Sequence, residues 1–155
     1  MKRIMFVCLG NICRSPLAEA VFNHFADLRD LSSRFSADSS GTTGYHAGER
    51  SDPRMREVAK SHGVTINHRA QKLTRQHLAE FDMILCMDRE NLRDARALAR
   101  SESERDRIQL FRVFDPEGTG SVPDPYYGGV EGFETVFDIV ARSATALLDR
   151  LEQER

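Results

Sequence analysis

Residues 4–16 read IMFVCLGNICRSP and join an apolar run to a turn and a helix start. The run from Ile4 to Val7 is uninterrupted, which is typical of a strand buried on both faces of a sheet. Ser15-Pro16 favours a helix start, because proline fits the first turn, where its missing N–H would have no partner. The stretch therefore predicts a buried strand, a loop from Cys8 to Ser15, and a helix.

Apolar residues at strand and helix spacing alternate along the rest of the chain. We expect further strands at 34–39, 83–87 and 108–114, and further helices at 55–62, 90–100 and 130–151. The polar segment 101–107 is expected to be an exposed helix or loop. Helices between short apolar strands imply right-handed crossovers. The sequence thus predicts one α/β domain over residues 1–155, with a four-stranded parallel sheet flanked by helices in a doubly wound, flavodoxin-like arrangement.

Composition restricts the possible functions. The 155 residues include 30% charged and 40% hydrophobic ones, with a formal net charge of −2, which is ordinary for a globular protein. Such a chain has no overall attraction to nucleic acid or anionic membrane, so a bound anion must be held locally. The apolar run at 4–9 is too short for a secretion signal or a membrane span, and we expect a cytoplasmic protein.

The cysteines and histidines favour neither disulfides nor a metal site. The cysteines are odd in number for a disulfide framework: Cys8, Cys13 and Cys86. The five histidines are scattered, and no cysteine or histidine pair has the spacing of metal ligands. We expect no metal and no other cofactor. Cys86 lies in an apolar run and is interpreted as an inert core residue.

The loop from Cys8 to Ser15 has the features of an anion site. Ligands of parallel α/β sheets bind at the carboxyl ends of the strands, where a first helical turn offers unpaired N–H groups. Gly10 and Asn11 tolerate the dihedral angles of a tightly curled loop. Arg14 adds a planar guanidinium that can hold two phosphoryl oxygens. No Gly-Lys-Ser/Thr follows, so this is not a nucleotide-binding loop.

Cys8 lies at the centre of this positive field. Helix N-termini and cationic neighbours favour a thiolate over a thiol. We therefore expect Cys8 to be a nucleophile aimed at a bound tetrahedral anion, with the Ser15 hydroxyl donating a hydrogen bond to its sulfur. A buried structural cysteine near a surface arginine is the alternative, and the spacing of Cys8 and Arg14 alone leaves both interpretations open.

Over nearly its whole length the chain resembles the low-molecular-weight protein tyrosine phosphatases. VCLGNICRSPLAEAVF at 7–22 matches that family's phosphate loop and first helix, and PDPYYGG at 123–129 matches its acid loop. SSGT at 39–42, DPR at 52–54 and ILCMD at 84–88 lie between them in the expected order.

The resemblance implies metal-independent hydrolysis of phosphotyrosine and small aryl phosphates through a phosphocysteine. Cys8 would be the nucleophile, Arg14 would stabilise the phosphoryl oxygens, and Asp124 would protonate the leaving oxygen. The rest of the phosphate-binding loop would be Leu9, Gly10, Asn11, Ile12, Cys13 and Ser15. The residues that support the loop would be Ser40, His68 and Asp88, and those that wall the substrate cleft would be Tyr45, Tyr126 and Tyr127.

Residue patterns alone choose the acid less firmly. Asp-Pro pairs begin at 52, 115 and 124, and such pairs are common in turns. Asp115 is closer to the end of the last expected strand, whereas two neighbouring tyrosines favour Asp124, because aromatic rings suit an aryl substrate. The resemblance decides for Asp124. By its polar surroundings alone, His68 would be a surface histidine.

Proteins of the same fold supply alternative functions. Arsenate reductases need additional thiols for a disulfide relay, and here only Cys86 lies outside the loop. Protein-arginine phosphatases carry Thr where this chain has Ile12, whose bulk favours an aryl phosphate. A non-catalytic anion-binding module would need neither the thiol nor the acid.

The resemblance also implies a tyrosine-phosphorylated protein as substrate and a tyrosine kinase as partner, in a chain that is a monomer or a weak dimer. Cys13 raises a hypothesis of redox regulation. Peroxide would convert the Cys8 thiolate into a sulfenic acid, and Cys13 would capture it as a disulfide if the two Cα atoms lie within ~4.4–6.8 Å.

Overall fold

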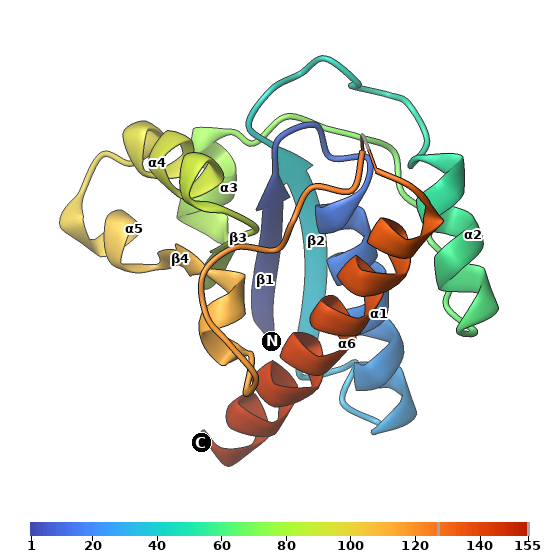
Figure 1. The fold of residues 1–155 in the computed structure, drawn as a ribbon. Coiled ribbons are helices and arrows are strands. Elements are labelled where there is room, and N and C mark those ends of the chain that lie inside the picture. The colour runs from blue at the N-terminus through green and yellow to red at the C-terminus, as the bar shows by residue number, and fades with distance from the viewer. Residues whose placement is uncertain (127, 155) are drawn as a thin grey trace.

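A four-stranded parallel sheet forms the centre of the protein in the computed structural model, which describes residues 1–126 and 128–154 (Figure 1). Its strands are β1 (Lys2–Cys8), β2 (Phe35–Gly41), β3 (Met83–Cys86) and β4 (Ile108–Leu110). They stand in the order β2-β1-β3-β4, and each neighbouring pair is parallel. The order reverses beside β1, so the carboxyl end of β1 is the place where this type of sheet binds ligands. The predicted four-stranded parallel sheet is confirmed.

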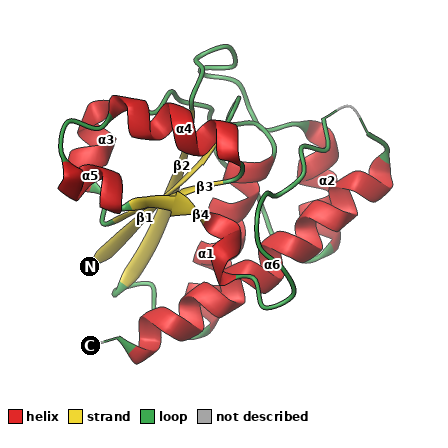
Figure 2. Cartoon of the chain, turned by 60° about the vertical axis from the view of Figure 1, so that its left-hand side comes forward, coloured by secondary structure: helices red, strands yellow, loops and turns green. Residues whose placement is uncertain are grey.

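Helices cover both faces of the sheet (Figure 2). They are α1 (Arg14–Leu28), α2 (Pro53–Ser61), α3 (Arg75–Glu80), α4 (Arg89–Leu98), α5 (Glu102–Asp106) and α6 (Val130–Gln153). Helices α1, α2 and α6 lie on one side, and α3, α4 and α5 lie on the other. Within the described part of the chain, no helix has both the length and the apolar character that crossing a bilayer requires.

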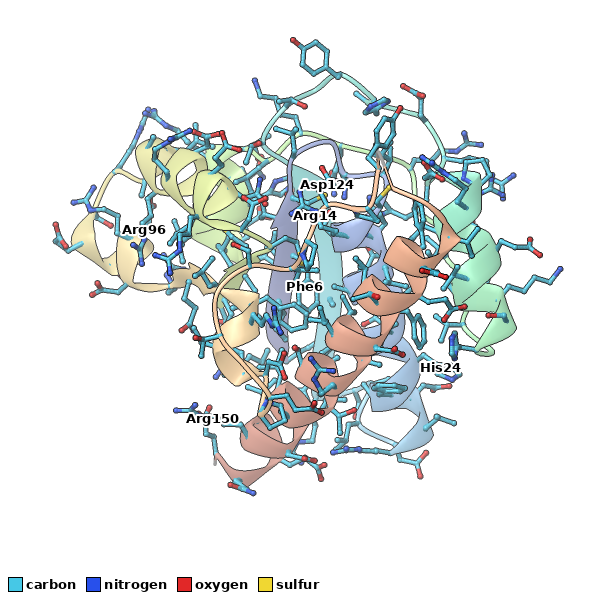
Figure 3. The ribbon with its side chains drawn as sticks, in the orientation of Figure 1. Phe6, Arg14, His24, Arg96, Asp124 and Arg150 are labelled. Carbon is cyan, nitrogen blue, oxygen red and sulfur yellow. The ribbon has the colours of Figure 1, made fainter. Side chains whose placement is uncertain are left out.

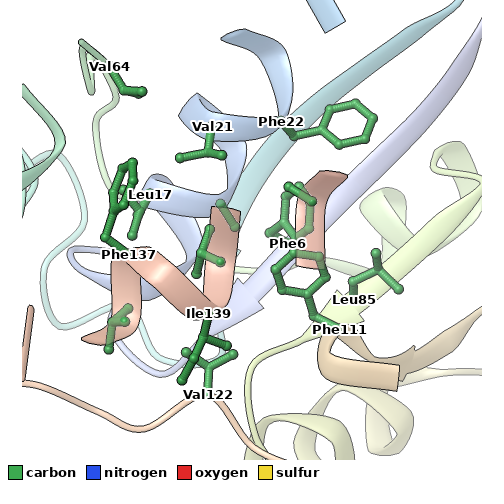
Figure 4. Packing of buried hydrophobic residues seen from close by; sticks show 14 of the residues in the cluster. Phe6, Leu17, Val21, Phe22, Val64, Leu85, Phe111, Val122, Phe137 and Ile139 are labelled. Carbon is green, nitrogen blue, oxygen red and sulfur yellow. The ribbon is translucent and has the colours of Figure 1, made fainter. Parts of the chain in front are cut away.

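The alternation of side chains along β1 divides the core in two. Ile4 and Phe6 face α1 and α6, whereas Met5 and Val7 face α3 and α4, and all four side chains are fully buried. Phe6 packs its ring between those of Phe22 and Phe111 (Figure 4), at centroid distances of 6.1 and 4.9 Å. The apolar run therefore fixes β1 in the middle of the sheet, and the loop after it opens at the sheet's carboxyl edge.

Two elements differ from the expectations. The last strand stops at Leu110, and a 3-10 helix, η1 (Phe111–Phe114), replaces the rest of the run at 108–114. The chain turns there because the Phe111 ring packs against Phe6 in the core. Helix α3 was not expected, since it has only six residues and its start is capped by Thr74 and His77 rather than by a Ser/Thr–Glu pair.

Candidate active site

The loop from Cys8 to Ser15 curls from the end of β1 into α1, as predicted. Its backbone is tied to the segment after β2, because the N–H groups of Thr42 and Thr43 donate to the carbonyls of Cys8 and Leu9 at 2.9 and 3.0 Å. Gly41 permits this close approach. A Cβ atom at Gly41 would lie 2.8 Å from the Leu9 carbonyl oxygen, so a larger residue there would push the loop away.

The Cys8 sulfur lies at the base of the loop, buried, and receives polar contacts from two sides. The Asn11 N–H donates to Sγ at 3.3 Å, and the Ser15 hydroxyl lies 2.9 Å from Sγ. The expected contact between Ser15 and the sulfur is therefore present.

Asn11 holds the loop in its curled form. Its φ of 57° lies in the left-handed region, which asparagine tolerates better than most residues. The side-chain amide donates to the hydroxyls of Ser15 and Ser39 at 2.9 and 3.0 Å. Its oxygen accepts from the Gln71 N–H at 2.9 Å and lies 2.8 Å from Nε2 of His68. These four contacts offset the cost of the unusual backbone geometry.

Arg14 is buried and turns its guanidinium toward the cavity, so the alternative of a surface arginine is wrong. Nη1 donates to Oδ2 of Asp88 at 2.7 Å and to the Val122 carbonyl at 3.1 Å. Burial opposes its charge, but the neighbouring Cys8 sulfur and Asp88 carboxylate outweigh that effect and raise the pKa of Arg14 above its ordinary value. Asp88 also caps α4, because its Oδ1 accepts from the Asn91 N–H at 2.8 Å.

The cavity above the loop has a volume of about 570 Å³ and is lined by residues from three segments. Cys8 and Arg14 form its base, and Asp124, Tyr45 and Tyr126 line its walls. An Asp124 oxygen lies 3.7 Å from Nη2 of Arg14, and Figure 3 shows the two labelled side chains together. The Asp124 side chain is 43% exposed, which gives it access to substrate and water. Tyr127, the third predicted wall residue, lies outside the described residues.

The hydrogen-bonding role expected of Ser40 belongs to Ser39 instead. Among the described residues, the buried Ser40 hydroxyl has no hydrogen-bond partner, whereas the Ser40 carbonyl accepts from the Ser15 hydroxyl at 3.4 Å. Ser39 accepts from Asn11, as described above. The register explains the difference: Ser39 pairs with Phe6 and Ser40 with Val7, so the two hydroxyls point to opposite faces of the sheet.

His68 supports the loop from behind and is not the surface residue that its polar surroundings suggest. Its side chain is only 8% exposed. Besides the contact with Asn11, its Nδ1 lies 3.1 Å from Oε1 of Glu19 and 3.9 Å from Oδ1 of Asp38. The three side chains offer potential metal ligands within 4.8 Å of one another. Glu19 also accepts from the Ser39 hydroxyl at 2.7 Å, so these groups already serve the hydrogen-bond network beneath the loop.

The other two cysteines differ in their surroundings. Cys13 lines the cavity beside Cys8. Burial, with added repulsion from Asp52 and the Cys8 sulfur, raises the pKa of the Cys13 thiol above its ordinary range. Cys86 is fully buried with Met5 and Val7, on the face of the sheet away from α1, as expected of a core residue.

Several residues of the site were missed from the sequence. The alternation of β2 could have identified Ser39, and the SSGT motif could have pointed to Gly41. Glu19 lies on α1, where it looks like an ordinary exposed helix residue, and Gln71 lies in a segment without regular structure. His46 and Glu49 also line the cavity, and no local pattern marks them.

Comparison with known proteins gives consistent matches. The family model described as low molecular weight phosphotyrosine protein phosphatase matches residues 3–155. A low molecular weight protein-tyrosine-phosphatase of Streptomyces coelicolor is 40% identical over 155 residues, covering 98% of this chain and 94% of the relative. The human low molecular weight phosphotyrosine protein phosphatase is 41% identical over 150 residues, covering 96% and 95%.

Solved structures agree with this. A crystal structure of a protein tyrosine phosphatase from Entamoeba histolytica, with Hepes in its active site, matches with a TM-score of 0.95 and 37% identity over 99% of this chain and 98% of that chain. The drosophila arginine phosphatase matches with a TM-score of 0.91 and 30% identity over 100% of both chains, so the fold alone does not separate the two activities. Because the family model and both relatives cover nearly the whole chain, this protein belongs to the low molecular weight phosphotyrosine protein phosphatase family.

Proposed function

We propose that this protein hydrolyses phosphotyrosine in two steps through a phosphocysteine on Cys8. Its family acts on phosphorylated proteins. The observation that carries the mechanism is that the Cys8 sulfur, the Arg14 guanidinium and the Asp124 carboxyl group line one cavity.

In the first step, the Cys8 thiolate attacks phosphorus as the bond from phosphorus to the tyrosine oxygen breaks. Protonated Asp124 gives its proton to the departing phenolate, so that tyrosine leaves as the neutral phenol. The loop N–H groups and the Arg14 guanidinium hold the three equatorial oxygens, whose charge is spread in the transition state.

In the second step, the carboxylate of Asp124 takes a proton from a water molecule that attacks phosphorus. The sulfur–phosphorus bond breaks, inorganic phosphate forms, and Cys8 leaves as a thiolate. The contacts from Ser15 and the Asn11 N–H stabilise that thiolate and make it a better leaving group.

The depth of the cavity supports an aryl substrate. Cys8 is buried at its base, whereas Tyr45 stands at the rim with 87% of its surface exposed. A phosphoryl group held at Cys8 would place the ring of phosphotyrosine near Tyr126, which lines the same cavity, whereas a phosphoserine side chain is shorter by the whole ring. We expect a phosphotyrosine peptide to be hydrolysed, and the same peptide with phosphoserine to react at a rate close to that without enzyme.

Phosphoarginine is the second candidate substrate, because an arginine phosphatase shares the fold. Ile12 lines the cavity and places an apolar side chain where a guanidinium would need hydrogen-bond acceptors. We therefore expect a higher kcat/KM for a phosphotyrosine peptide than for its phosphoarginine counterpart. Arsenate reduction is less well supported, since Cys86 is fully buried on the other face of the sheet and out of reach for a thiol relay.

The decisive test is the initial rate of aryl-phosphate hydrolysis, in a chelator and a thiol reductant, for wild type, Cys8→Ser and Cys86→Ser. Activity that persists with the chelator, disappears in Cys8→Ser and remains in Cys86→Ser supports the mechanism. Cys86→Ser is the matched control, because it also removes a buried thiol at a strand end. No hydrolysis by well-folded wild type would contradict the proposal.

Redox control of the same site is a further part of the proposal. The thiol of Cys13, which lines the same cavity, attacks the sulfur of a sulfenic acid at Cys8 and forms the disulfide with loss of water. After peroxide and then reductant, we expect Cys13→Ser to regain a smaller fraction of its own untreated activity than wild type. Equal recovery would contradict this.

Compartment and partners follow from the same chemistry. The catalytic thiol must stay reduced, which favours the cytoplasm, and phosphotyrosine requires a tyrosine kinase acting on the same substrate proteins. A monomer or a weak dimer is the expected state of the chain, and light scattering of the purified protein at several concentrations tests it.

A further inference from the structure

The segment that carries Asp124 has no regular structure of its own. It leaves η1 at Asp115 and reaches α6 at Val130, without a helix or strand among its described residues, 115–126 and 128–129. Figure 1 shows this orange segment crossing in front of β1 toward the loop that follows β1. The Tyr126 N–H donates to Oδ1 of Asp124 at 3.1 Å within the segment, and contacts with the rest of the molecule hold the segment over the cavity.

One such contact centres on Asp115, the Asp-Pro aspartate that the catalytic site does not use. Its carboxylate is fully buried and accepts from Nε of Arg112 at 2.8 Å and from Nε and Nη2 of Arg142 at 2.8 and 3.0 Å. The Glu117 N–H donates to it at 2.9 Å. The hydrogen bonds from Arg142 and the other donors outweigh burial and lower the pKa of Asp115 far below its usual range. This carboxylate links η1 to α6.

Arg112 extends this link to the segment between η1 and α6 that carries Asp124, which we call the acid segment. While Nε of Arg112 binds Asp115, Nη1 donates to the Ser121 carbonyl at 3.0 Å. The turn between these residues passes close by, since a Cβ atom at Gly118 would lie 3.2 Å from Nη2 of Arg112. Asp115 fixes one side of the planar guanidinium, so the direction of its other side is fixed as well.

The residue after Ser121 is the point where the segment meets the catalytic centre. The Val122 N–H donates to the Met87 carbonyl at 2.7 Å, and the Val122 carbonyl accepts from Nη1 of Arg14 at 3.1 Å. Asp124 follows two residues later, with an oxygen 3.7 Å from Nη2 of Arg14. A continuous series of hydrogen bonds thus runs from Asp115 through Arg112 to the backbone that carries Asp124.

We propose that Arg112 and Asp115 are positioning residues for the general acid, acting through the Ser121 carbonyl. The inference rests on the proposed function, in which Asp124 protonates the leaving oxygen. An ion pair that served stability alone would be complete with Asp115 and Arg142. It would not require the hydrogen bond from Nη1 of Arg112 to the Ser121 carbonyl. The side chain of Arg112 is mostly buried, with 19% of its surface exposed, and Arg142 still binds Asp115 when Arg112 is replaced.

A misplaced acid has a specific kinetic signature. Misplacing a reacting group by about 1 Å can cost 10²-fold in rate. The loss falls mainly on substrates whose leaving group needs a proton, because a stable phenolate departs without one. A variant that only destabilises the fold lowers the amount of active enzyme, and therefore lowers the apparent kcat/KM of every substrate by the same factor.

The experiment compares kcat/KM for 4-nitrophenyl phosphate and phenyl phosphate in Arg112→Met, with Arg150→Met as the matched control. Arg150 lies over the ring of Phe114 in η1, at 5.7 Å from its centroid, and near the far end of α6 from the cavity (Figure 3). The measured quantity is kcat/KM for 4-nitrophenyl phosphate divided by kcat/KM for phenyl phosphate. We expect this ratio to rise about tenfold in Arg112→Met, because part of a general-acid contribution of about 10²–10⁴ is lost for phenyl phosphate. The ratio should not change in Arg150→Met.

Two further variants keep the test interpretable. Asp124→Asn must raise the ratio most, and if it does not, the assignment of the acid fails rather than the role of Arg112. Arg112→Lys keeps a cation beside Asp115 but cannot also donate to the Ser121 carbonyl, so it should raise the ratio as well. It serves as the test variant if Arg112→Met does not fold. An Asp124→Asn response together with an unchanged ratio in the folded Arg112 variants would overturn the inference.

Discussion

The phosphate-binding loop and the acid segment line the same cavity, but they are held in place very differently. The loop is fixed by side chains and backbone from several elements, and the Asn11 side chain alone makes four contacts, three of them to residues outside the loop. The acid segment is anchored at Ser121, Val122 and Tyr126, and Asp124 itself is partly exposed. Binding a multiply charged phosphoryl group demands fixed dipoles, whereas delivering a proton requires access to solvent. Changes in the loop should therefore affect every substrate, and changes in the acid segment should affect substrates selectively.

The largest selective effect is expected for Asp124→Asn. Loss of general acid help should lower kcat/KM for phenyl phosphate by about 10²–10⁴, with a smaller loss for 4-nitrophenyl phosphate. Steady-state kinetics with both substrates measures it. An equal loss for both would mean that the acid segment also controls binding, and the contrast between the two regions would disappear.

Arg14→Lys should have the next largest effect, and it should be uniform. Lysine keeps the charge but cannot hold two phosphoryl oxygens while binding Asp88 and the Val122 carbonyl. Removal of such a transition-state contact typically costs about 10²–10³ in kcat. Steady-state kinetics with the same two phenyl esters should give equal losses, and a change in KM alone would contradict this role.

Asn11 offers a comparison of side chain and backbone within the loop. Asn11→Ala removes the four contacts and disfavours the positive φ, whereas Asn11→Gly removes the contacts but accepts that φ. We expect Ala to lower the free energy of unfolding by about 1–3 kcal/mol, and Gly to lower it less. Chemical denaturation measures both values. If Asn11→Gly lowered the free energy of unfolding more than Asn11→Ala does, the positive φ of Asn11 would not contribute to the difference between the variants.

The smallest effect is expected for Asp52, which together with Arg54 connects the loop to the acid segment, and it is an effect on stability. The Asp52 N–H donates to the Ile12 carbonyl, and Arg54, paired with Asp52, donates to the Tyr126 carbonyl. Burial opposes ionisation of Asp52, but the hydrogen bonds from Arg54 outweigh it and lower the pKa of Asp52. Because the folded pKa lies below the unfolded one, this stabilisation is present above the ordinary pKa of aspartate, about 3.9, and is lost as pH falls through the folded value.

Asp52→Asn keeps the cap on α2 and should therefore destabilise the protein only slightly at neutral pH. The difference from wild type should disappear in acid. Thermal unfolding of both proteins between neutral and acidic pH measures the difference in stability. A difference in stability that widens as pH falls would contradict the lowered pKa of Asp52.

The sequence predicted the two regions to different degrees, for a physical reason. The loop follows from local signals, because an apolar strand, Gly10, Asn11 and a Ser-Pro helix start are contiguous. The long-range partners Ser39 and Glu19 depend on the register of β2 and the facing of α1, which local patterns do not fix. The position of Asp124 depends on contacts of Val122 with Arg14 and Met87, which are far away in the sequence, so residue patterns left Asp115 as a rival for the acid. Only the family resemblance separated those two.

The central claim is that the reaction passes through a phosphocysteine on Cys8. The most direct measurement is acid quenching of the enzyme during turnover of an aryl phosphate, followed by mass analysis of its peptides. We predict one added phosphoryl group on the peptide that contains Cys8, and none in Cys8→Ser or in enzyme quenched before substrate is added. Turnover without any phosphorylated peptide, or with the phosphoryl group on another residue, would contradict the mechanism.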